Sequence, residues 1–536
     1  VVARLPTGEI EERIVTDEMT FELVESSNLN FKADPGKFKL AMEAKRMELA
    51  GVFDPFVALS SSNLKPLPHQ LSAVYGELLT RVPLRFLLAD EPGAGKTIMA
   101  GLLIKELILR GFLKRCLIVC PGSLDEQWSG ELREKFGLSF KPVTKSDLDQ
   151  VNTVNPFTES NFLIARMDQL ARGNKAIQDR LDETDWDLVI IDEAHRMSAR
   201  QVGPKQAAVE TLRFKLGQRL SKKANHFLLM TATPHTGSDE NFHLFLSLLD
   251  PEMFSGNFRK GEAKIDAAPV MLRRVKEKLV TFEGEKLFPK RTSVTVSFEL
   301  SELEQQLYEA VTEYVKEEMA RANAFSSQNS RKRGNVSFAL TVLQRRLASS
   351  PKAILNSLER RLARLQTINP LDEKVASELS EDLLEIAEFE ELDNEFSEGE
   401  LESVEQSQIL DGVTAAVNQD ELKQELQTLA KLVVLAKAVV DSKTDTKWVQ
   451  LRSILESEQM RVGDEGAFEK LIVFTEHRDT LDYLKQRVQE TLGADFKVVS
   501  IHGGNSREER LRSQTEFTNN PMAPILLATD AAGEGI

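Results

Sequence analysis

Cysteine is scarce in this chain of 536 residues, which has only Cys116 and Cys120. Both stand in the apolar run CLIVCPG, and two thiols inside one such run support neither a disulfide framework nor a zinc site. Long apolar runs are absent as well: no stretch approaches the ~18 uncharged residues that span a bilayer, and no charged-then-apolar leader opens the chain. We therefore expect a soluble, intracellular protein without a membrane partner, and we predict that both cysteines are buried in a strand.

Basic residues are also fewer than acidic ones, 68 against 84, which gives a net charge of −16. Taken alone, that value argues against a nucleic-acid partner. Residues 381–405, however, hold twelve acidic residues and no lysine or arginine, so the rest of the chain carries only −4. Global charge therefore leaves room for a locally basic groove. The acidic tract itself is interpreted as a mobile solvated loop or an acidic helix.

The chain is too long for one hydrophobic core, and its patterns divide it into four parts. Residues 1–57 mix alternating and helical stretches, which indicates an accessory region with a partial β module and a helix. Residues 58–300 alternate short apolar strands with amphipathic stretches of helical length, which predicts a parallel sheet covered on both faces. Residues 301–445 carry i, i+3, i+4 apolar spacing and predict a helical insertion. The α/β alternation resumes over 446–536.

The fold class is therefore α/β, with two doubly wound parallel-sheet lobes and an inserted helical region. The expected strands are 84–89, 115–120, 162–165, 187–191 and 226–230 in the first lobe, and 470–474, 497–501 and 525–528 in the second, which also has expected helices at 479–490 and 506–517. The last apolar strand runs straight into the end of the chain, and the first residue is not methionine. We therefore expect a piece of a longer protein with an incomplete second lobe.

A glycine-containing loop follows the first expected strand, in the stretch RFLLADEPGAGKT at 85–97. In a phosphate-binding loop, glycines let successive backbone N–H groups turn toward an anion, a lysine reaches the outer phosphates, and a hydroxyl holds magnesium. Lys96 and Thr97 suit the last two roles. The strict pattern G-x-x-x-x-G-K-[ST] has glycine where Asp90 stands, so this loop alone leaves an ordinary strand-to-helix turn open.

Two further strand ends carry candidate chemistry. In DLVIIDEAH, 187–195, a buried strand delivers Asp192 and Glu193 to its carboxyl end, where ligands bind in an open α/β sheet. One carboxylate suits magnesium and the other a base for water, although the pair alone fits a solvated turn equally well. FLLMTATPHTG, 227–237, ends on Thr231 and Thr233, which could sense phosphate. Taken singly, that threonine-rich end is better explained as a helix cap.

Together and in this order, the three strand ends resemble those of the superfamily 2 helicase-type ATPases. The residues of these motifs resemble the Swi/Snf-like branch, especially the bacterial RapA (HepA)-like group, in which Asp-Glu begins the phosphate loop. The likeness covers residues 64–300 and 446–536. The first-lobe segments that carry it are LPHQ (67–70), LLADEPGAGKTIMAGLLIKELI (87–108), LIVCPGSLDEQW (117–128), DEAH (192–195) and LLMTATPHTGSDENFHLFLSLLDP (228–251).

The resemblance implies that ATP and Mg²⁺ are bound between two RecA-like lobes. It implies that Lys96, Asp192 and Glu193 are catalytic, with Glu193 as the base for water attack and with Thr97 and Asp192 organising magnesium. Gln70 would read the adenine edge. The implied nucleotide-binding residues are Gln70, Gly93, Ala94, Gly95, Lys96, Thr97 and Ile98. The implied residues coupling hydrolysis to motion are His195, Thr231 and Thr233.

The second-lobe segments KLIVFTEHRDTLDYL (470–484), VVSIHGG (498–504) and ILLATDAAGEGI (525–536) also resemble motifs of the family. The residues implied to lie along a nucleic-acid backbone are Thr475, His502, Gly503 and Thr529, and those near the interlobe nucleotide are Asp530, Gly533 and Gly535. The family's arginine-finger motif falls beyond Ile536, so we expect this chain to bind nucleotide but to hydrolyse it poorly.

The function that the resemblance implies is ATP-driven translocation along duplex DNA, or remodelling of protein–DNA complexes, in the bacterial cytoplasm. A strand-separating DNA or RNA helicase and an ATP-switched scaffold remain alternatives, the latter within a transcription or anti-phage defence complex. RNA polymerase is the protein partner that the resemblance suggests.

Three other features have simpler interpretations. LQRRLASSP (343–351) and SRKRGN (330–335) fit DNA phosphate contacts or a solvated helix face. MLRRVKEKL (271–279) resembles a family segment whose arginines touch phosphate or support the lobe. Trp128 and Trp186 are interpreted as packing residues.

Overall fold

The computed structural model contains two units, Val1–Val57 and Ala58–Ile536. In the first unit, β1 (Val2–Arg4) pairs antiparallel with β2 (Ile10–Glu12), and α1 spans Pro35–Phe53. A hairpin and a helix thus lie in the region where the sequence indicated a β module and a helix. The structure describes residues 2–4, 10–12, 34–53, 56–122, 124–151, 154–200, 208–234, 239–254, 267–324, 330–367, 411, 413–457, 461–462, 467–493 and 495–529.

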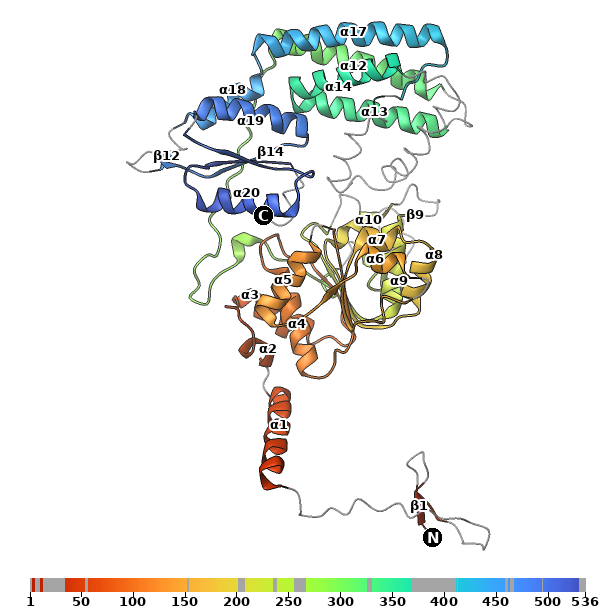
Figure 1. Ribbon diagram of the computed structural model, residues 1–536, viewed down its shortest axis with the longest axis vertical. Coiled ribbons are helices and arrows are strands. Elements are labelled where there is room, and N and C mark those ends of the chain that lie inside the picture. Colours follow the sequence, from red (N-terminus) through yellow and green to blue (C-terminus); the bar gives the residue numbers. More distant parts are fainter. Residues whose placement is uncertain are drawn as a thin grey trace. The chain divides into compact units, whose positions relative to one another are not determined.

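A seven-stranded sheet forms the core of the part that follows (Figure 1). Its strand order is β11-β3-β10-β7-β4-β6-β5, and every neighbouring pair is parallel. The strands are β3 (Arg85–Leu88), β4 (Cys116–Cys120), β5 (Lys141–Pro142), β6 (Phe162–Arg166), β7 (Trp186–Ile191), β10 (Ala224–Met230) and β11 (Met271–Leu272). The five predicted strands are confirmed. Sequence reasoning missed β5 and β11, which are two-residue strands at the two edges and too short for a periodic pattern.

Both faces of this sheet are buried, as predicted. Successive strand residues alternate between two clusters, so that Leu87 and Leu229 point to one face and Phe86 and Leu228 to the other. Helices that supply several buried residues to the second face are η1 (Ser72–Leu78), α4 (Lys96–Leu109) and α5 (Asp125–Phe136). Helices with buried residues on the first face include α6 (Lys145–Asp149), α7 (Met167–Ala171), α8 (Lys175–Asp182), α9 (Leu212–Lys223) and α10 (Asp239–Leu246). The two cysteines are buried in β4, as expected.

The predicted helical insertion is a packed group of long helices. These are α12 (Glu302–Asn323), α13 (Ser330–Ser349), α14 (Pro351–Thr367) and α17 (Gln419–Ser442), which share one hydrophobic core. Local sequence sets their starts: Ser301 and Glu304 form a reciprocal capping box before α12, and Pro351 opens α14, where its missing N–H costs nothing. The acidic tract at 381–405 lies outside the described residues.

The second α/β part contains a three-stranded parallel sheet in the order β14-β16-β15. Its elements are α18 (Thr446–Leu455), β14 (Leu471–Phe474), α19 (Arg478–Leu492), β15 (Val498–Ile501), α20 (Arg507–Asn519) and β16 (Ile525–Ala528). Each predicted strand and helix here is found within two residues of its expected bounds. Within the described residues, no helix combines the length and apolarity needed to cross a bilayer.

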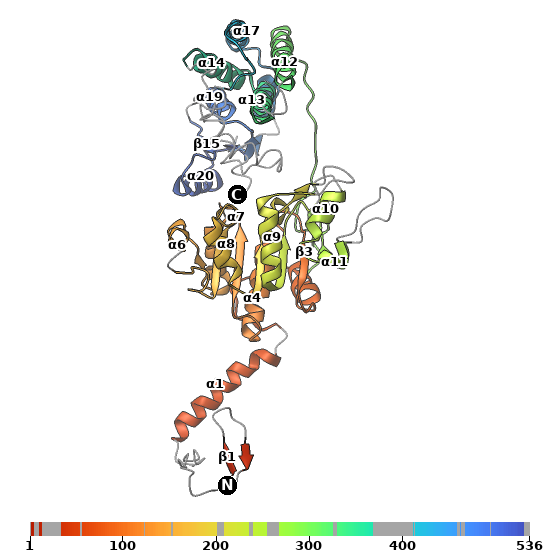
Figure 2. The same ribbon diagram turned by 90° about the vertical axis from the view of Figure 1, so that its right-hand side faces the viewer.

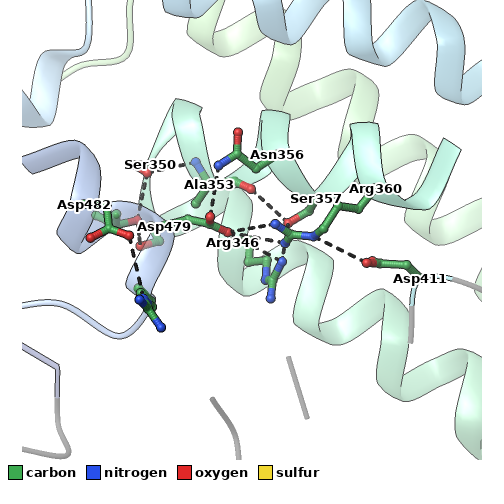
Figure 3. A network of polar contacts seen from close by, with 12 residues as sticks. Arg346, Ser350, Ala353, Asn356, Ser357, Arg360, Asp411, Asp479 and Asp482 are labelled. Carbon is green, nitrogen blue, oxygen red and sulfur yellow. Dashed lines mark hydrogen bonds and ion pairs between the residues drawn. The ribbon is translucent and has the colours of Figure 1, made fainter. Parts of the chain in front are cut away.

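A polar network holds the helical insertion on this second sheet, and Figure 3 shows it. Asp479, near the start of α19, accepts a hydrogen bond from Asn356 Nδ2 at 3.0 Å and one from Arg360 Nη2 at 3.3 Å. Arg346 lies 3.8 Å from the same carboxylate and is 5% exposed. The view turned by 90° in Figure 2 also places α14 beside α19. Arg346 in the stretch 343–351 is therefore an interface residue, which corrects both of its sequence interpretations.

Candidate nucleotide-binding site

The loop between β3 and α4 requires glycine at two positions. Gly93 and Gly95 have φ of +80° and +86°, in the left-handed region that side chains disfavour. A Cβ on Gly95 would also lie 2.4 Å from Nε2 of Gln70, so the position is closed sterically as well. Lys96 begins α4, and its Nζ donates to the Asp90 carbonyl at 2.9 Å. The loop thus has the backbone shape of a phosphate cradle, with the lysine folded over it.

Asp90, which departs from the strict loop pattern, is an anchor for the segment after β11. It is fully buried, and Arg274 donates to it from the backbone N–H (2.9 Å), from Nε (3.1 and 3.2 Å to the two oxygens) and from Nη2. Arg274 Nη1 also donates to the carbonyl of His69. Of the two roles predicted for the arginines of 271–279, the structure gives Arg274 the supporting one.

The conformation of the loop is fixed by further contacts around it. His69 Nε2 donates to the Ala94 carbonyl at 2.8 Å, and Gln70 Nε2 lies 3.4 Å from the same oxygen. On the β11 side, Glu91 N–H donates to the Arg274 carbonyl, and Glu91 Oε2 accepts from the Lys276 N–H at 2.9 Å. Gln70, expected to read adenine, thus lies directly against the loop.

Asp192 lies at the end of β7 and is 7% exposed. Its Oδ2 accepts a hydrogen bond from the Trp128 indole at 2.8 Å, and its Oδ1 accepts one from the Glu193 N–H at 3.0 Å. Burial, and then the charge of Glu193, raise the pKa of Asp192 to about 6, against the effect of these two donors. Trp128, interpreted from sequence as a packing residue, therefore also fixes the orientation of this carboxylate.

Glu193 and the three expected coupling residues are linked by contacts. Glu193 has a left-handed backbone with φ of +46°, unusual for a residue with a side chain. Its Oε2 lies 3.3 Å from His195 Nδ1, which lies 2.8 Å from Thr231 Oγ1. Thr231 Oγ1 also accepts from the Thr233 N–H at 3.1 Å. Burial raises the pKa of Glu193, but the hydrogen bond and charge of His195 and the charge of Lys96 outweigh it and lower the pKa.

The lysine and the two acids interact although they come from different strands. Burial lowers the pKa of Lys96, while the charges of Glu193 and Asp192 act to raise it. The strands that end in these groups, β3 and β7, both pair with β10, whose carboxyl end carries Thr231. The carboxyl ends of these three strands therefore lie together on the same side of the sheet. Thr97 and Ile98 follow in the first turn of α4, and both are half-buried.

Three of the four residues expected along a nucleic acid also lie at one sheet edge. Thr475, His502 and Thr529 directly follow β14, β15 and β16, which are neighbouring parallel strands. The backbone N–H groups of Thr475 and Thr529 donate across the ends of these strands, to the carbonyls of Ala528 and Ile501. The predicted residues Asp530, Gly533 and Gly535 lie outside the described residues.

Basic side chains lie near His502, at the carboxyl ends of the strands of the second sheet. Burial, and then the charge of Arg478, lower the pKa of His502, with smaller effects of Lys485 and Arg510 in the same direction. Arg510 Nη2 donates to the carbonyl of Gly503 at 2.9 Å. Sequence reasoning named His502 and Gly503 but missed these basic neighbours. The signal for them is present in the motifs EHRD and REER, where the cations flank the expected strand ends.

Fold and site together define an α/β protein in which a glycine loop with the shape of a phosphate cradle and a neighbouring acidic pair lie on one parallel sheet. Residues 77–353 match the SNF2-related domain, and residues 449–536 match the helicase conserved C-terminal domain. The chain therefore belongs to the SNF2-related family, and the Swi/Snf-like, RapA-like assignment from its motifs is confirmed.

Two curated relatives show the extent of the likeness. RNA polymerase-associated protein RapA of Yersinia pestis and that of Serratia proteamaculans are each 33% identical to this chain over 220 residues, which are 41% of this chain and 22% of the relative. The match thus spans about a fifth of the length of these relatives. The SWI2/SNF2 ATPase core of Sulfolobus solfataricus in complex with dsDNA aligns over 89% of this chain and 80% of its own, at 15% identity and a TM-score of 0.36. At that score the structural match adds nothing to the assignment.

Proposed function

We propose that this chain is the motor part of an ATP-dependent, Swi/Snf-like translocase on duplex DNA. The observation that carries the proposal is the convergence of Lys96, Asp192 and Glu193 at one edge of the sheet, where the charges of the two acids act on the lysine. Membership of the SNF2-related family supports the same reading. The proposed domains are residues 58–300 for the first ATP-binding lobe, 301–445 for the helical insertion and 446–536 for the second lobe.

The loop residues fit the phosphates of ATP. Gly93 and Gly95 keep side chains away from the cradle, so that backbone N–H groups of the loop are free to face an anion. Lys96 would exchange its bond to the Asp90 carbonyl for one to a phosphate oxygen, which an ammonium group prefers because the oxygen is charged. Ala94 and Ile98 would complete the cradle, and Gln70 would meet the adenine.

The acids and Thr97 fit a magnesium ion. Asp192 and the Thr97 hydroxyl would hold it, because a carboxylate and a hydroxyl are oxygen ligands of the type magnesium prefers. Magnesium, when bound, would neutralise charge on the phosphates. Glu193 would take the proton of the attacking water, and its lowered pKa keeps it ionised for that role. His195 would fix the Glu193 carboxylate and pass its state to Thr231 and Thr233.

The second sheet supplies the proposed track contact. Thr475, His502, Gly503 and Thr529 lie at or beside strand ends near Arg478 and Arg510, and such groups bind phosphates without reading sequence. Asp530, Gly533 and Gly535 would approach the interlobe nucleotide. RNA polymerase is the proposed protein partner because the curated relatives are named for it. A bacterial cytoplasmic location and slow hydrolysis by these 536 residues stay predictions.

The test is the ATPase rate of the full-length protein with no polymer, duplex DNA, single-stranded DNA and RNA. We expect duplex DNA to stimulate most. Lys96→Ala should lose nucleotide binding, whereas Glu193→Gln should bind ATP and fail to hydrolyse it. Unchanged nucleotide binding by Lys96→Ala would overturn the proposal. Stimulation by RNA alone would exclude a duplex-DNA track, and strand displacement would favour a helicase.

A further inference from the structure

Lys276 brings a second ammonium group to the phosphate loop. It opens the short η3 helix (Lys276–Lys278), four residues after β11 ends. Its Nζ lies 3.3 Å, and its Cε 3.4 Å, from the point where a Cβ on Gly93 would stand. Gly93 is a left-handed glycine in the middle of the loop. The ammonium group therefore lies directly against the part of the chain that faces a bound phosphate in this class of loop.

Three restraints hold Lys276 in place, two on the backbone around it and one on its side chain. The Lys276 N–H donates to Glu91 Oε2 at 2.9 Å, which ties its backbone to the loop. Arg274, two residues earlier, is fixed by the buried Asp90. The Phe288 ring stacks on the ammonium group, with Nζ 5.1 Å from the ring centroid. Among the described residues Lys276 has no ion-pair partner, so its charge is positioned without being neutralised by a carboxylate.

The sheet order fixes the side from which Lys276 approaches. β11 pairs with β3 on the edge opposite to β10, and β7 with its acids lies beyond β10. Lys276 therefore reaches the loop from the side away from Asp192 and Glu193. The positive charge of Lys276 repels that of Lys96 and therefore acts to lower the pKa of Lys96. Two like charges beside one loop repel each other, and a bound polyanion relieves that repulsion.

We propose that Lys276 is a second phosphate-binding cation of the nucleotide site, and that it contacts the phosphates that ATP and ADP share. The outermost phosphate would lie toward magnesium and the acids, on the far side of the loop from Lys276. This inference rests on the proposed function, because it assigns a residue to the same nucleotide.

Calorimetric binding of ATP and of ADP, each with magnesium and without nucleic acid, tests the assignment. Lys276→Gln removes one charge-assisted contact, so we expect the Kd of both nucleotides to rise about tenfold. Lys276→Arg keeps the charge and should bind both nearly as wild type does. Lys278→Gln, an exposed lysine of the same short helix, is the matched control and should leave both affinities unchanged. Thermal unfolding without nucleotide checks that each variant is folded.

The remaining outcomes contradict either this inference or the proposed function, and they can be told apart. Unchanged affinities in a folded Lys276→Gln protein would overturn the inference while the proposed function stands. A loss confined to ATP would overturn the assignment to the shared phosphates. If the wild-type chain binds neither nucleotide, the proposed function itself fails. Should Lys276→Gln not fold, Lys276→Met keeps the apolar contact with Phe288, and the same tenfold loss is expected.

Discussion

Arg274 and Asp90, 184 positions apart, form a bidentate ion pair in which the carboxylate is fully buried. The pair joins the first residue of the phosphate loop to the segment that leaves the sheet after β11. An aspartate at this position is thus compatible with a phosphate loop, because Arg274 neutralises its charge and the carboxylate does not face the ligand.

Replacing Arg274 by alanine should destabilise the chain severely. The substitution leaves the buried Asp90 without its partner, and breaking such a pair costs about 3–5 kcal/mol. Urea denaturation measures the change in the free energy of unfolding. The neighbouring Arg273 is exposed, so Arg273→Ala is the matched control and should change little. A loss below about 1 kcal/mol for Arg274→Ala, the range of an exposed pair, would contradict the anchoring role.

Trp128→Phe should raise the magnesium concentration that nucleotide binding requires. Phenylalanine keeps the buried ring but removes the indole N–H that fixes Asp192 Oδ2. Loss of such an orienting contact behind a metal ligand costs about tenfold or more in metal affinity. The measurement is a magnesium titration of nucleotide binding. Trp186→Phe is the control, because Trp186 begins β7 at the end opposite to Asp192. Equal requirements in all three proteins would reduce Trp128 to a packing residue.

Thr231→Val should separate nucleotide binding from its stimulation by DNA. Valine has nearly the same shape but lacks the hydroxyl that contacts His195 and accepts from Thr233. In the full-length protein, we expect ATP affinity to stay near that of wild type and the DNA-stimulated part of the ATPase rate to be lost. Thr231→Ser restores the hydroxyl and should restore the stimulation. A Thr231→Val protein that DNA still stimulates fully would exclude this chain of contacts as the coupling route.

Asp479→Ala should loosen the helical insertion from the second sheet. The carboxylate holds Asn356 and Arg360 and lies near Arg346, while its own exposure reduces the value of each contact. We expect a loss of about 1–3 kcal/mol and faster hydrogen exchange in α14 and α19. Asp482→Ala changes a more exposed acid on the same helix and serves as the control. Unaltered exchange in α14 would show that Asp479 does not hold the insertion.

The strands of both sheets could be predicted because each is a continuous apolar run, the pattern of a parallel strand covered on both faces, although Ile472 and Phe474 of β14 are exposed. The phosphate loop, the acidic pair and the threonine pair could be placed at strand ends for the same reason. The edge strands β5 and β11 could not, since two-residue strands have no period. Missing β11 also meant missing what it positions, namely the bond of Arg274 to Asp90 and the ammonium group of Lys276 beside Gly93.

Sequence alone was also ambiguous where a side chain has two plausible environments. Arg346 stands in a basic, amphipathic stretch that fits solvent or phosphate, and only the packing of α14 on α19 shows that it is buried. Trp128 has the local pattern of a core residue, and it is one. Its hydrogen bond to Asp192 depends on the pairing of β4 with β7, which no local pattern specifies.

Glu318→Gln should stabilise the chain at high pH. Glu318 is 2% exposed in the core-facing side of α12, and its Oε2 accepts no hydrogen bond from the described residues. Burial, and then the charge of Glu425, raise its pKa to about 7. Between pH 4.5 and 7, the unfolded chain gives up this proton while the folded chain keeps it, so stability falls as pH rises through that window.

Glutamine has no proton to lose, so the variant escapes this fall. We expect Glu318→Gln to be more stable than wild type by about 1–3 kcal/mol at pH 8, and the difference to shrink toward zero below pH 5. Urea denaturation at both pH values measures it. Glu317→Gln, the exposed neighbour, should show no such pH-dependent gain. If Glu318→Gln is instead less stable at pH 8, then the ion pair with Arg321 outweighs the cost of burying the carboxylate.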